Sequence, residues 1–215
     1  MTHFVNNNTL NKPRGLNMKK LNVLAISAAV AASSFGGMSV AQAEVTENLS
    51  VTTNYIWRGV AQSGAEADVQ GGLDWANDSG IYAGAWLSGS ANELDMYAGW
   101  SKGMFDVGYI KYYFTQDDSL HASEVYAGVT VSDWTAKLYV DTDTDDSGDN
   151  MYFEVVGDIG PININAGLNM NDADAAEYAQ VTVGYTHKNL TLAIAMTDID
   201  NADEEISLTY SFPFE

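Results

Sequence analysis

Near its C-terminal end the chain reads Ile206-Ser207-Leu208-Thr209-Tyr210-Ser211-Phe212, in which apolar or aromatic side chains alternate without interruption with the hydroxyl-bearing side chains of Ser and Thr. Successive side chains of a β-strand point to opposite faces, so this alternation gives a strand one apolar and one polar face. The same period occurs in Ile162-Asn163-Ile164-Asn165-Ala166 and in further segments back to Leu49. About twelve such segments follow one another, and none has a helical period. The sequence therefore predicts an all-β fold.

Short and long connections alternate between the predicted strands. Tight links rich in turn-forming residues occur at 77–80, 101–103, 132–133, 160–161 and 188–189, and longer links at 61–67, 88–93, 115–122, 141–149, 169–176 and 197–204. An even number of strands, with short turns at one end and longer loops at the other, is typical of outer-membrane barrels. We predict a transmembrane antiparallel up-and-down β-barrel of about 12 strands.

The distribution of charge indicates which face of each strand meets lipid. On our assignment the apolar faces contain one formal charge, Lys111, and the polar faces contain eight: Arg58, Asp74, Asp95, Asp106, Glu124, Lys137, Glu154 and Asp158. A Lys or Arg at the bilayer midplane costs about 2–4 kcal/mol, so we expect the apolar faces to point outward. A soluble secreted barrel alternates in the same way and stays open as a rival interpretation.

Aromatic residues favour the membrane interpretation, because they gather at the ends of the apolar faces. We expect two girdles: Trp75, Trp100, Phe105, Trp134, Tyr185 and Phe212 near the short turns, and Tyr55, Trp57, Tyr113 and Phe153 near the long loops.

Composition excludes several classes of function. The chain has 215 residues, no cysteine, and 29 acidic against 9 basic residues, for a formal net charge of -20. Such an acidic chain repels nucleic acid, and thiolate chemistry is impossible without cysteine. The sequence has 3 histidines and no motif that fixes a catalytic group. We expect no enzymatic activity and no cofactor beyond weakly bound calcium or magnesium.

The first 43 residues have the pattern of a signal peptide with an N-terminal extension. A positive region, Met18-Lys19-Lys20, precedes the apolar stretch 21–32, and Ala41-Gln42-Ala43 is a small-x-small cleavage signal. We predict that residues 44–215 form the barrel after export, in the outer membrane of a bacterial cell.

One part of the sequence resembles the TorF-like porin family. The resemblance is carried by the segments 54–63 (NYIWRGVAQS), 69–75 (VQGGLDW), 80–86 (GIYAGAW) and 93–99 (ELDMYAG). The specific motifs cover about residues 45–115. Over the remainder of the chain the resemblance lies mainly in the length and spacing of the predicted strands. The resemblance implies a small outer-membrane barrel that acts as a porin.

The predicted function is passive passage of small hydrophilic solutes or ions through this barrel. The candidate lumen or constriction residues are Arg58, Asp74, Asp95, Asp106, Glu124, Lys137 and Glu154. For Arg58 two roles are open: an ion pair that fixes the first hairpin, with Asp74 on the neighbouring strand, or a constriction residue that faces acidic groups of the lumen.

Acidic residues are concentrated in the predicted long loops, which contain 18 of the 29 acids, Asp68 and Glu93 among them. An acidic mouth attracts cations, so we expect a weak preference for cations. Asp141, Asp143, Asp145 and Asp149 form a candidate site for weak binding of calcium or magnesium. The alternative function is a closed structural or surface-interaction barrel whose acidic loops bridge divalent cations to lipopolysaccharide. Outer-membrane lipid and lipopolysaccharide are expected partners of either barrel, and the oligomeric state stays open.

Overall fold

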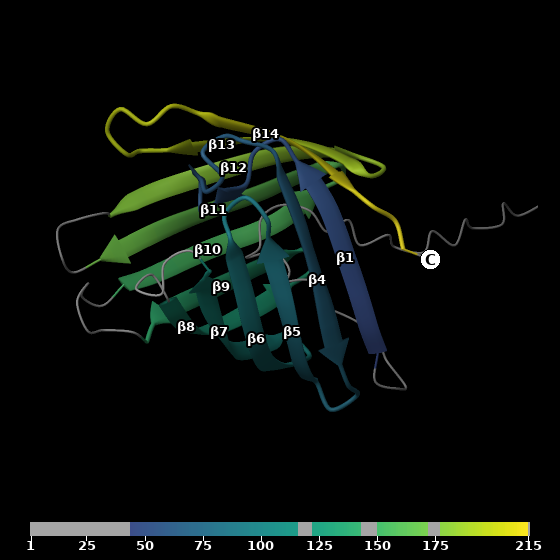
Figure 1. The fold of residues 1–215 in the computed structure, drawn as a ribbon. Coiled ribbons are helices and arrows are strands. Elements are labelled where there is room, and N and C mark those ends of the chain that lie inside the picture. The colour runs from purple at the N-terminus through teal and green to yellow at the C-terminus, as the bar shows by residue number, and fades with distance from the viewer. Residues whose placement is uncertain (1–43, 116–121, 143–149, 172–176, 215) are drawn as a thin grey trace, which may run out of the picture.

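The computed structural model of the chain describes residues 44–115, 122–142, 150–171 and 177–214. Twelve of the strands in these ranges form a closed antiparallel barrel, in which each strand pairs with the wall strand that precedes it and the last pairs with the first (Figure 1). The wall consists of β1 (Glu44–Thr52), β4 (Asp68–Ala76), β5 (Ile81–Ser88), β6 (Glu93–Lys102), β7 (Phe105–Phe114), β8 (Ala122–Val131), β9 (Trp134–Asp141), β10 (Asn150–Ile159), β11 (Ile162–Asn171), β12 (Tyr178–His187), β13 (Leu190–Thr197) and β14 (Glu205–Ser211). The predicted all-β class and the 12-stranded barrel are confirmed.

The tight turns lie at one end of the barrel, together with both ends of the wall. In the turn between β4 and β5, the Asn77 side-chain oxygen accepts hydrogen bonds from the backbone nitrogens of Ser79 (3.0 Å) and Ile81 (3.2 Å). Glu44, at the start of β1, pairs with Ala76 beside this turn. The backbone nitrogen of Ser211, at the end of β14, donates to the carbonyl oxygen of Asn189 in the turn before β13. The predicted alternation of turns therefore matches the wall.

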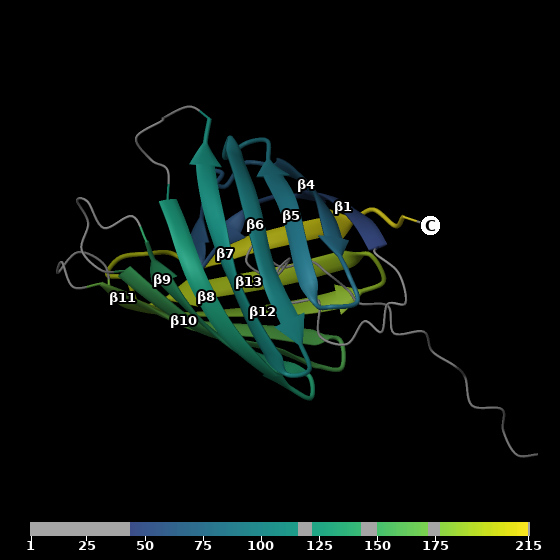
Figure 2. The same ribbon diagram turned by 90° about the horizontal axis from the view of Figure 1, so that it is seen from below.

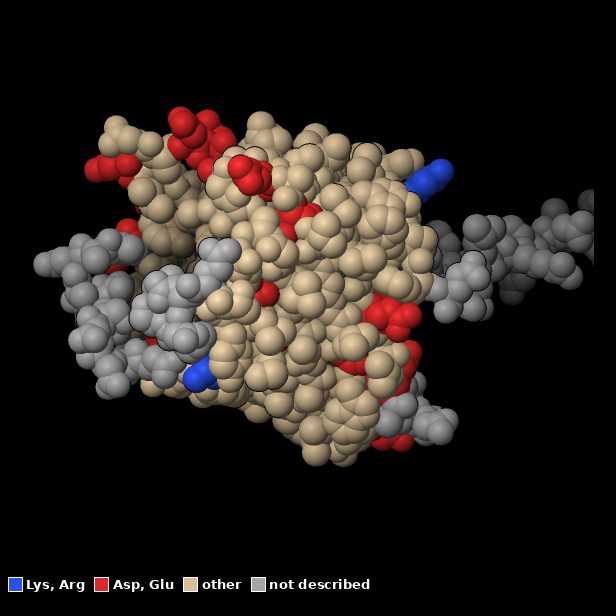
Figure 3. All heavy atoms as spheres, viewed as in Figure 1, with Lys and Arg blue, Asp and Glu red and all other residues tan. Residues whose placement is uncertain are grey.

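Alternate side chains of the wall strands point outward, and most of these are apolar. On β13, Leu192, Ile194 and Met196 are 41–48% exposed, whereas Ala193 and Ala195 between them are at most 2% exposed. On the face of the barrel that Figure 3 shows, most of the surface is uncharged, and most acidic side chains lie toward the two ends. Among the described residues no helix has the length and apolarity to cross a bilayer. The apolar residues of the strands thus form an outer surface and leave the interior to the polar ones.

The joint between β1 and β14 is the shortest in the wall. Three register pairs join these strands, from Ser50 with Ser211 to Thr52 with Thr209, whereas β1 pairs with β4 along its whole length. One backbone hydrogen bond continues the joint on each side, from Thr53 to Leu208 and from Phe212 to Leu49. The pairing stops because the chain leaves the wall after Thr52.

The chain enters the barrel after Thr52 instead of continuing β1. We call residues 53–67 the inner segment; its residues 54–63 are buried or half-buried, and residues 64–67 are exposed. The segment includes a small hairpin formed by β2 (Ile56–Trp57) and β3 (Val60–Ala61). Figures 1 and 2 show β4–β7 on one side of the barrel and β11–β13 on the other. The hairpin contacts both sides, because Trp57 packs edge-on against Tyr112 of β7 and the backbone oxygen of Arg58 accepts a hydrogen bond from Tyr178 of β12 (3.2 Å).

The inner segment corrects the prediction for the first strand. Tyr55 and Trp57 were expected in the outward girdle, but Tyr55 is 1% exposed inside the barrel and Trp57 lies beside it in the hairpin. An alternation of aromatic residues fits an outward girdle and an inward plug equally well, since it does not specify which side of the wall the strand occupies. The backbone departs from extended geometry at Arg58 (φ 49°) and Gly59 (φ 82°), which turn the chain back on itself.

Candidate functional site: the barrel interior

Arg58 occupies the tip of the inner segment and is the central charge of the barrel interior. Its Nη2 atom lies 2.8 Å from the Oε2 atom of Glu124 on β8. Its guanidinium carbon lies 4.3 Å from the ring centroid of Trp57, 4.1 Å from that of Tyr152 and 5.2 Å from that of Tyr139. A flat guanidinium that stacks on aromatic rings while it binds a carboxylate uses properties that lysine lacks. The residue is held by charge and by stacking together.

Gly59 allows this tip to approach the far wall. A Cβ atom at Gly59 would lie 2.7 Å from the Cβ atom of Gln180 on β12 and 2.9 Å from Cγ2 of Thr197 on β13. Its φ of 82° is also a conformation that side-chain-bearing residues rarely adopt. Arg58 and Gly59 thus place the tip of the hairpin between β8 on one side and β12 and β13 on the other.

Glu124 and Asp74 have partners other than those expected from the sequence. Glu124 accepts a second hydrogen bond from the Tyr112 hydroxyl (2.8 Å), and it replaces Asp74 as the partner predicted for Arg58. Asp74 instead accepts hydrogen bonds from the Tyr97 hydroxyl and from the Asn48 side chain. The predicted ion pair exists, but it crosses the barrel to β8 and does not join neighbouring strands.

A second group of charges surrounds Lys137 on β9. Its Nζ atom lies 2.7 Å from Oδ2 of Asp106, and Lys137 stands opposite Glu154 in the register of β9 and β10. Asp106 also accepts a hydrogen bond from the Tyr82 hydroxyl (2.7 Å). Glu154 accepts from the Tyr139 hydroxyl (3.0 Å). Buried charges of opposite sign and tyrosine donors therefore satisfy one another along this part of the wall.

One side of the interior, which we call the aromatic wall, is lined by large side chains from β5 to β10. They are Tyr82, Trp86, Tyr97, Tyr112, Tyr126, Tyr139 and Tyr152, and all belong to one buried cluster with Tyr55. Glycines on adjacent strands make room for several of the rings, since a Cβ atom at Gly84 would lie 2.5 Å from the Tyr97 ring. The inner segment packs against this wall and closes that side of the interior.

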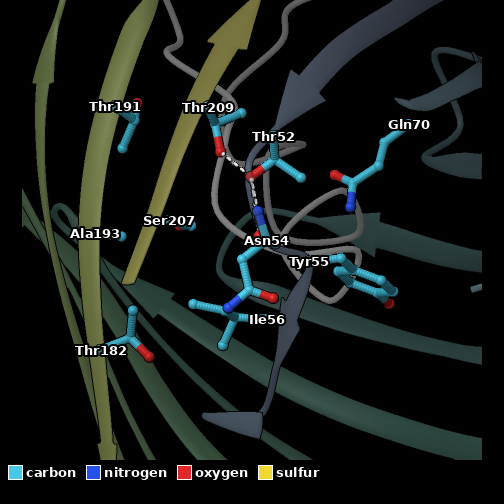
Figure 4. A pocket seen from close by; sticks show the side chains of 10 residues that line it. All are labelled: Thr52, Asn54, Tyr55, Ile56, Gln70, Thr182, Thr191, Ala193, Ser207 and Thr209. Atoms are coloured by element: carbon cyan, nitrogen blue, oxygen red, sulfur yellow. Dashed lines mark hydrogen bonds between the residues drawn. The ribbon is translucent and has the colours of Figure 1, made fainter. Parts of the chain in front are cut away.

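The opposite side, which we call the hydroxyl wall, carries short side chains on β12, β13 and β14. Thr182, Thr191, Ala193, Ser207 and Thr209 face the inner segment there (Figure 4). Between them and the inner segment lies a cavity of about 20 Å³, also lined by Thr52, Asn54, Tyr55, Ile56 and Gln70. Such a volume holds about one water molecule. This cavity is thus small, and it lies between the inner segment and β12–β14.

The structure brings together most of the interior residues singled out by the sequence. Arg58, Asp74, Asp95, Asp106, Glu124, Lys137 and Glu154 are all buried inside the barrel. Arg58 meets Glu124 and Lys137 meets Asp106. Asp158 is exposed near the end of β10. Of the candidate metal ligands, Asp141 ends β9, and Asp143, Asp145 and Asp149 lie outside the described residues.

Two interior acids were assigned to the loops by sequence reasoning. Asp68 and Glu93 are buried, at 1% and 5% exposure, and they begin β4 and β6. Asp68 accepts hydrogen bonds from the Ser88 hydroxyl (2.6 Å), the Gln70 side chain (3.0 Å) and the backbone nitrogen of Ser90 (2.8 Å). The available signal was their spacing: Asp68 is two residues before Gln70, and Glu93 is two before Asp95, so each shares a face with an interior residue.

Comparison with known proteins identifies a family and a set of similar folds. A family model described as a bacterial protein of unknown function (Gcw_chp) matches residues 37–211. No curated protein matches the chain. Among solved structures, one engineered variant of the porin of Rhodopseudomonas blastica is 13% identical, with a TM-score of 0.48, over 67% of this chain and 55% of the porin. Another variant of that porin is 14% identical, with a TM-score of 0.46, over the same shares. The chain thus spans about half the length of these porins.

Proposed function

The chain belongs to the Gcw_chp family of bacterial proteins of unknown function, and we propose that it is an outer-membrane barrel for passive passage of small hydrophilic solutes or ions. The resemblance to the TorF-like porin family supports the same function. No chemical step enters this proposal.

The observation that carries the proposal is the division of the wall into an apolar outside and a charged inside. Outward residues such as Leu73, Leu192 and Ile206 are 48–59% exposed, which a water-soluble wall would not need on every strand. The charged residues Arg58 and Lys137 are instead buried in the interior. A closed wall also leaves no long unpaired strand edge, as lipid requires.

The hydroxyl wall supports passage. The inner segment packs against the aromatic wall, whereas the residues of β12–β14 that line the cavity have side chains no larger than that of threonine. Because this space is narrow, we expect it to select water and small ions over larger solutes. Arg58 stands at the point where the inner segment is fixed and is the proposed constriction residue.

The charge of the interior supports a weak preference for cations. In the part of the chain that the structure describes, there are seven buried acids and two buried cations. The acids are Asp68, Asp74, Glu93, Asp95, Asp106, Glu124 and Glu154. A surplus of negative charge along a narrow path attracts cations and repels anions. The acidic residues of the long loops act in the same direction.

Bilayer conductance tests the proposal. The refolded barrel of residues 44–215 should give discrete current steps in a planar bilayer, and a salt gradient should give a reversal potential of the sign for cations. Swelling of liposomes with solutes of graded size would then measure the width of the path. A purified chain that stays monodisperse without detergent would contradict the membrane location. Insertion into the bilayer without measurable current would contradict passage.

The second candidate function is a closed structural or surface-interaction barrel. It is favoured by one observation, the small cavity of about 20 Å³ that the inner segment leaves. In this case the acidic loops would bridge divalent cations to lipopolysaccharide, with outer-membrane lipid as the other partner. The two functions separate in one experiment, because a closed barrel inserts into the bilayer without current.

A further inference from the structure

Two interior acids among the described residues, Glu93 and Asp95, have neither a salt bridge nor a well-formed hydrogen bond from another side chain. Arg58 binds Glu124 and Lys137 binds Asp106. Asp68, Asp74 and Glu154 accept hydrogen bonds from neighbouring side chains. Among the described residues, neither carboxylate oxygen of Asp95 has a hydrogen-bond partner, although the residue is 1% exposed.

Glu93 and Asp95 face the same space. They stand two residues apart on β6, and both side chains are buried on the inner face of the strand. In the strand register Asp95 stands opposite Trp86 on one side and Tyr112 on the other. Two neighbouring carboxylates buried among aromatic rings repel each other and lose hydration, which costs several kcal/mol unless a positive species lies between them.

The Tyr55 hydroxyl points to the same place from the inner segment. Tyr55 is 1% exposed, and among the described residues its hydroxyl has no well-formed hydrogen bond. The hydroxyl lies against Glu93, with Asp95 also nearby. A buried hydroxyl without a geometrically good partner is rare in folded proteins, and its oxygen is available as a ligand.

We propose that Glu93, Asp95 and the Tyr55 hydroxyl form a binding site for a hard cation such as calcium inside the barrel. Carboxylate and hydroxyl oxygens are the ligands that such cations prefer. No three acids or histidines in the described ranges are arranged to hold a metal ion, so water must complete the coordination shell. The site is therefore weak and exchangeable, and it binds the inner segment to β6 through Tyr55.

This cation site has two nearby acids that do not belong to it. Glu124 lies close to Asp95, but Arg58 neutralises it. Asp68 lies close to Glu93, but three donors satisfy it. Glu93 and Asp95 thus differ from these neighbours because they have neither a basic partner nor well-formed donors among the described residues. The site depends on the barrel geometry without requiring that the barrel conducts.

Terbium luminescence provides the test, with Tb³⁺ as the probe for calcium sites. Trp86 and Tyr55 lie at the site, with their ring centroids 5.4 Å apart, so a bound Tb³⁺ ion would be sensitised when these rings are excited. The refolded barrel should show this emission, and calcium should displace it. Glu93→Gln/Asp95→Asn should weaken the binding by about tenfold or more, and Tyr55→Phe should weaken it less.

Asp74→Asn is the matched control, because it removes an interior acid that already has its own donors. This variant should keep the emission of the unaltered chain. A second readout is thermal stability: calcium should raise the Tm of the unaltered barrel and leave that of Glu93→Gln/Asp95→Asn unchanged. Equal emission from all variants would overturn the site, since the ion would then be bound elsewhere, and so would an equal calcium effect on Tm. A barrel that binds Tb³⁺ but carries no current would overturn only the proposed function.

Discussion

Arg58 and Glu124 are 66 positions apart in the chain, yet their side chains meet inside the barrel with Nη2 and Oε2 2.8 Å apart. The contact fixes the tip of the inner segment to β8, and hence to the aromatic wall. The same tip contacts the opposite side of the barrel, where the Tyr178 hydroxyl donates to the backbone oxygen of Arg58 (3.2 Å). The Arg58–Glu124 pair is therefore one of several contacts that hold the inner segment in place across the interior.

Arg58→Ala should release the inner segment and widen the path. We expect the single-channel conductance to rise severalfold, and the free energy of unfolding to fall by about 3–5 kcal/mol because Glu124 is left buried without its cation. Planar-bilayer recording and urea unfolding in lipid vesicles measure the two effects. Arg58→Lys keeps the charge but loses the stacking, so it should show an intermediate effect. Unchanged conductance and ion preference in Arg58→Ala would remove the constriction role.

Gly59→Ala tests the fit of the hairpin tip. The added Cβ atom would meet Gln180 at 2.7 Å in a strained backbone conformation, so we expect a loss of about 1–3 kcal/mol from strain alone and more from the contact. Gly64→Ala is the control, since Gly64 has φ 62° but nothing within 4 Å of a Cβ atom. The folded fraction after refolding measures both. Equal losses in the two variants would show that the tip does not pack as described.

Ala193→Trp should block the remaining space. Ala193 is 2% exposed and lines the cavity on β13, and an indole ring is far larger than the cavity. We expect the conductance to fall severalfold while the barrel still inserts. Ile194→Trp, one residue along and outward, is the control and should conduct normally. If the two variants conduct alike, the path does not follow the hydroxyl wall.

Ile194→Lys tests the orientation of the wall in lipid. Ile194 lies in the middle of β13 and is 41% exposed. In a bilayer the lysine should cost about 2–4 kcal/mol, whereas on a water-facing surface it should cost little. Unfolding in vesicles, with Ile194→Ala for the loss of the side chain itself, gives the difference. A cost near zero would favour the soluble barrel.

Sequence reasoning predicted the wall because the wall obeys a local rule. Ile206 and Leu208 point outward and Ser207 inward because successive residues of a strand alternate, and the charged positions follow from the same rule. The rule does not predict the position of the inner segment. Tyr55 and Trp57 keep the sequence alternation of β1, but they lie inside the barrel in a segment whose tip pairs with Glu124 across the interior.

The partners of the interior charges could not be predicted from the sequence, for a related reason. An alternating pattern assigns Arg58, Asp74 and Glu124 to the interior but does not say which strands face one another across it. That depends on how the closed wall is sheared and on where the inner segment ends. The interior positions of Asp68 and Glu93 were missed because a strand boundary is the least certain part of a pattern.

The position of the inner segment constrains the order in which the barrel assembles. The segment directly follows β1, yet its tip is held by residues of β8, β12 and β13, which come later in the chain. The contacts that hold the hairpin can therefore form only after β8, β12 and β13 have taken their places. The part of the chain that is made first is then among the last to reach its final position, and a ring that closes without it would lack its core.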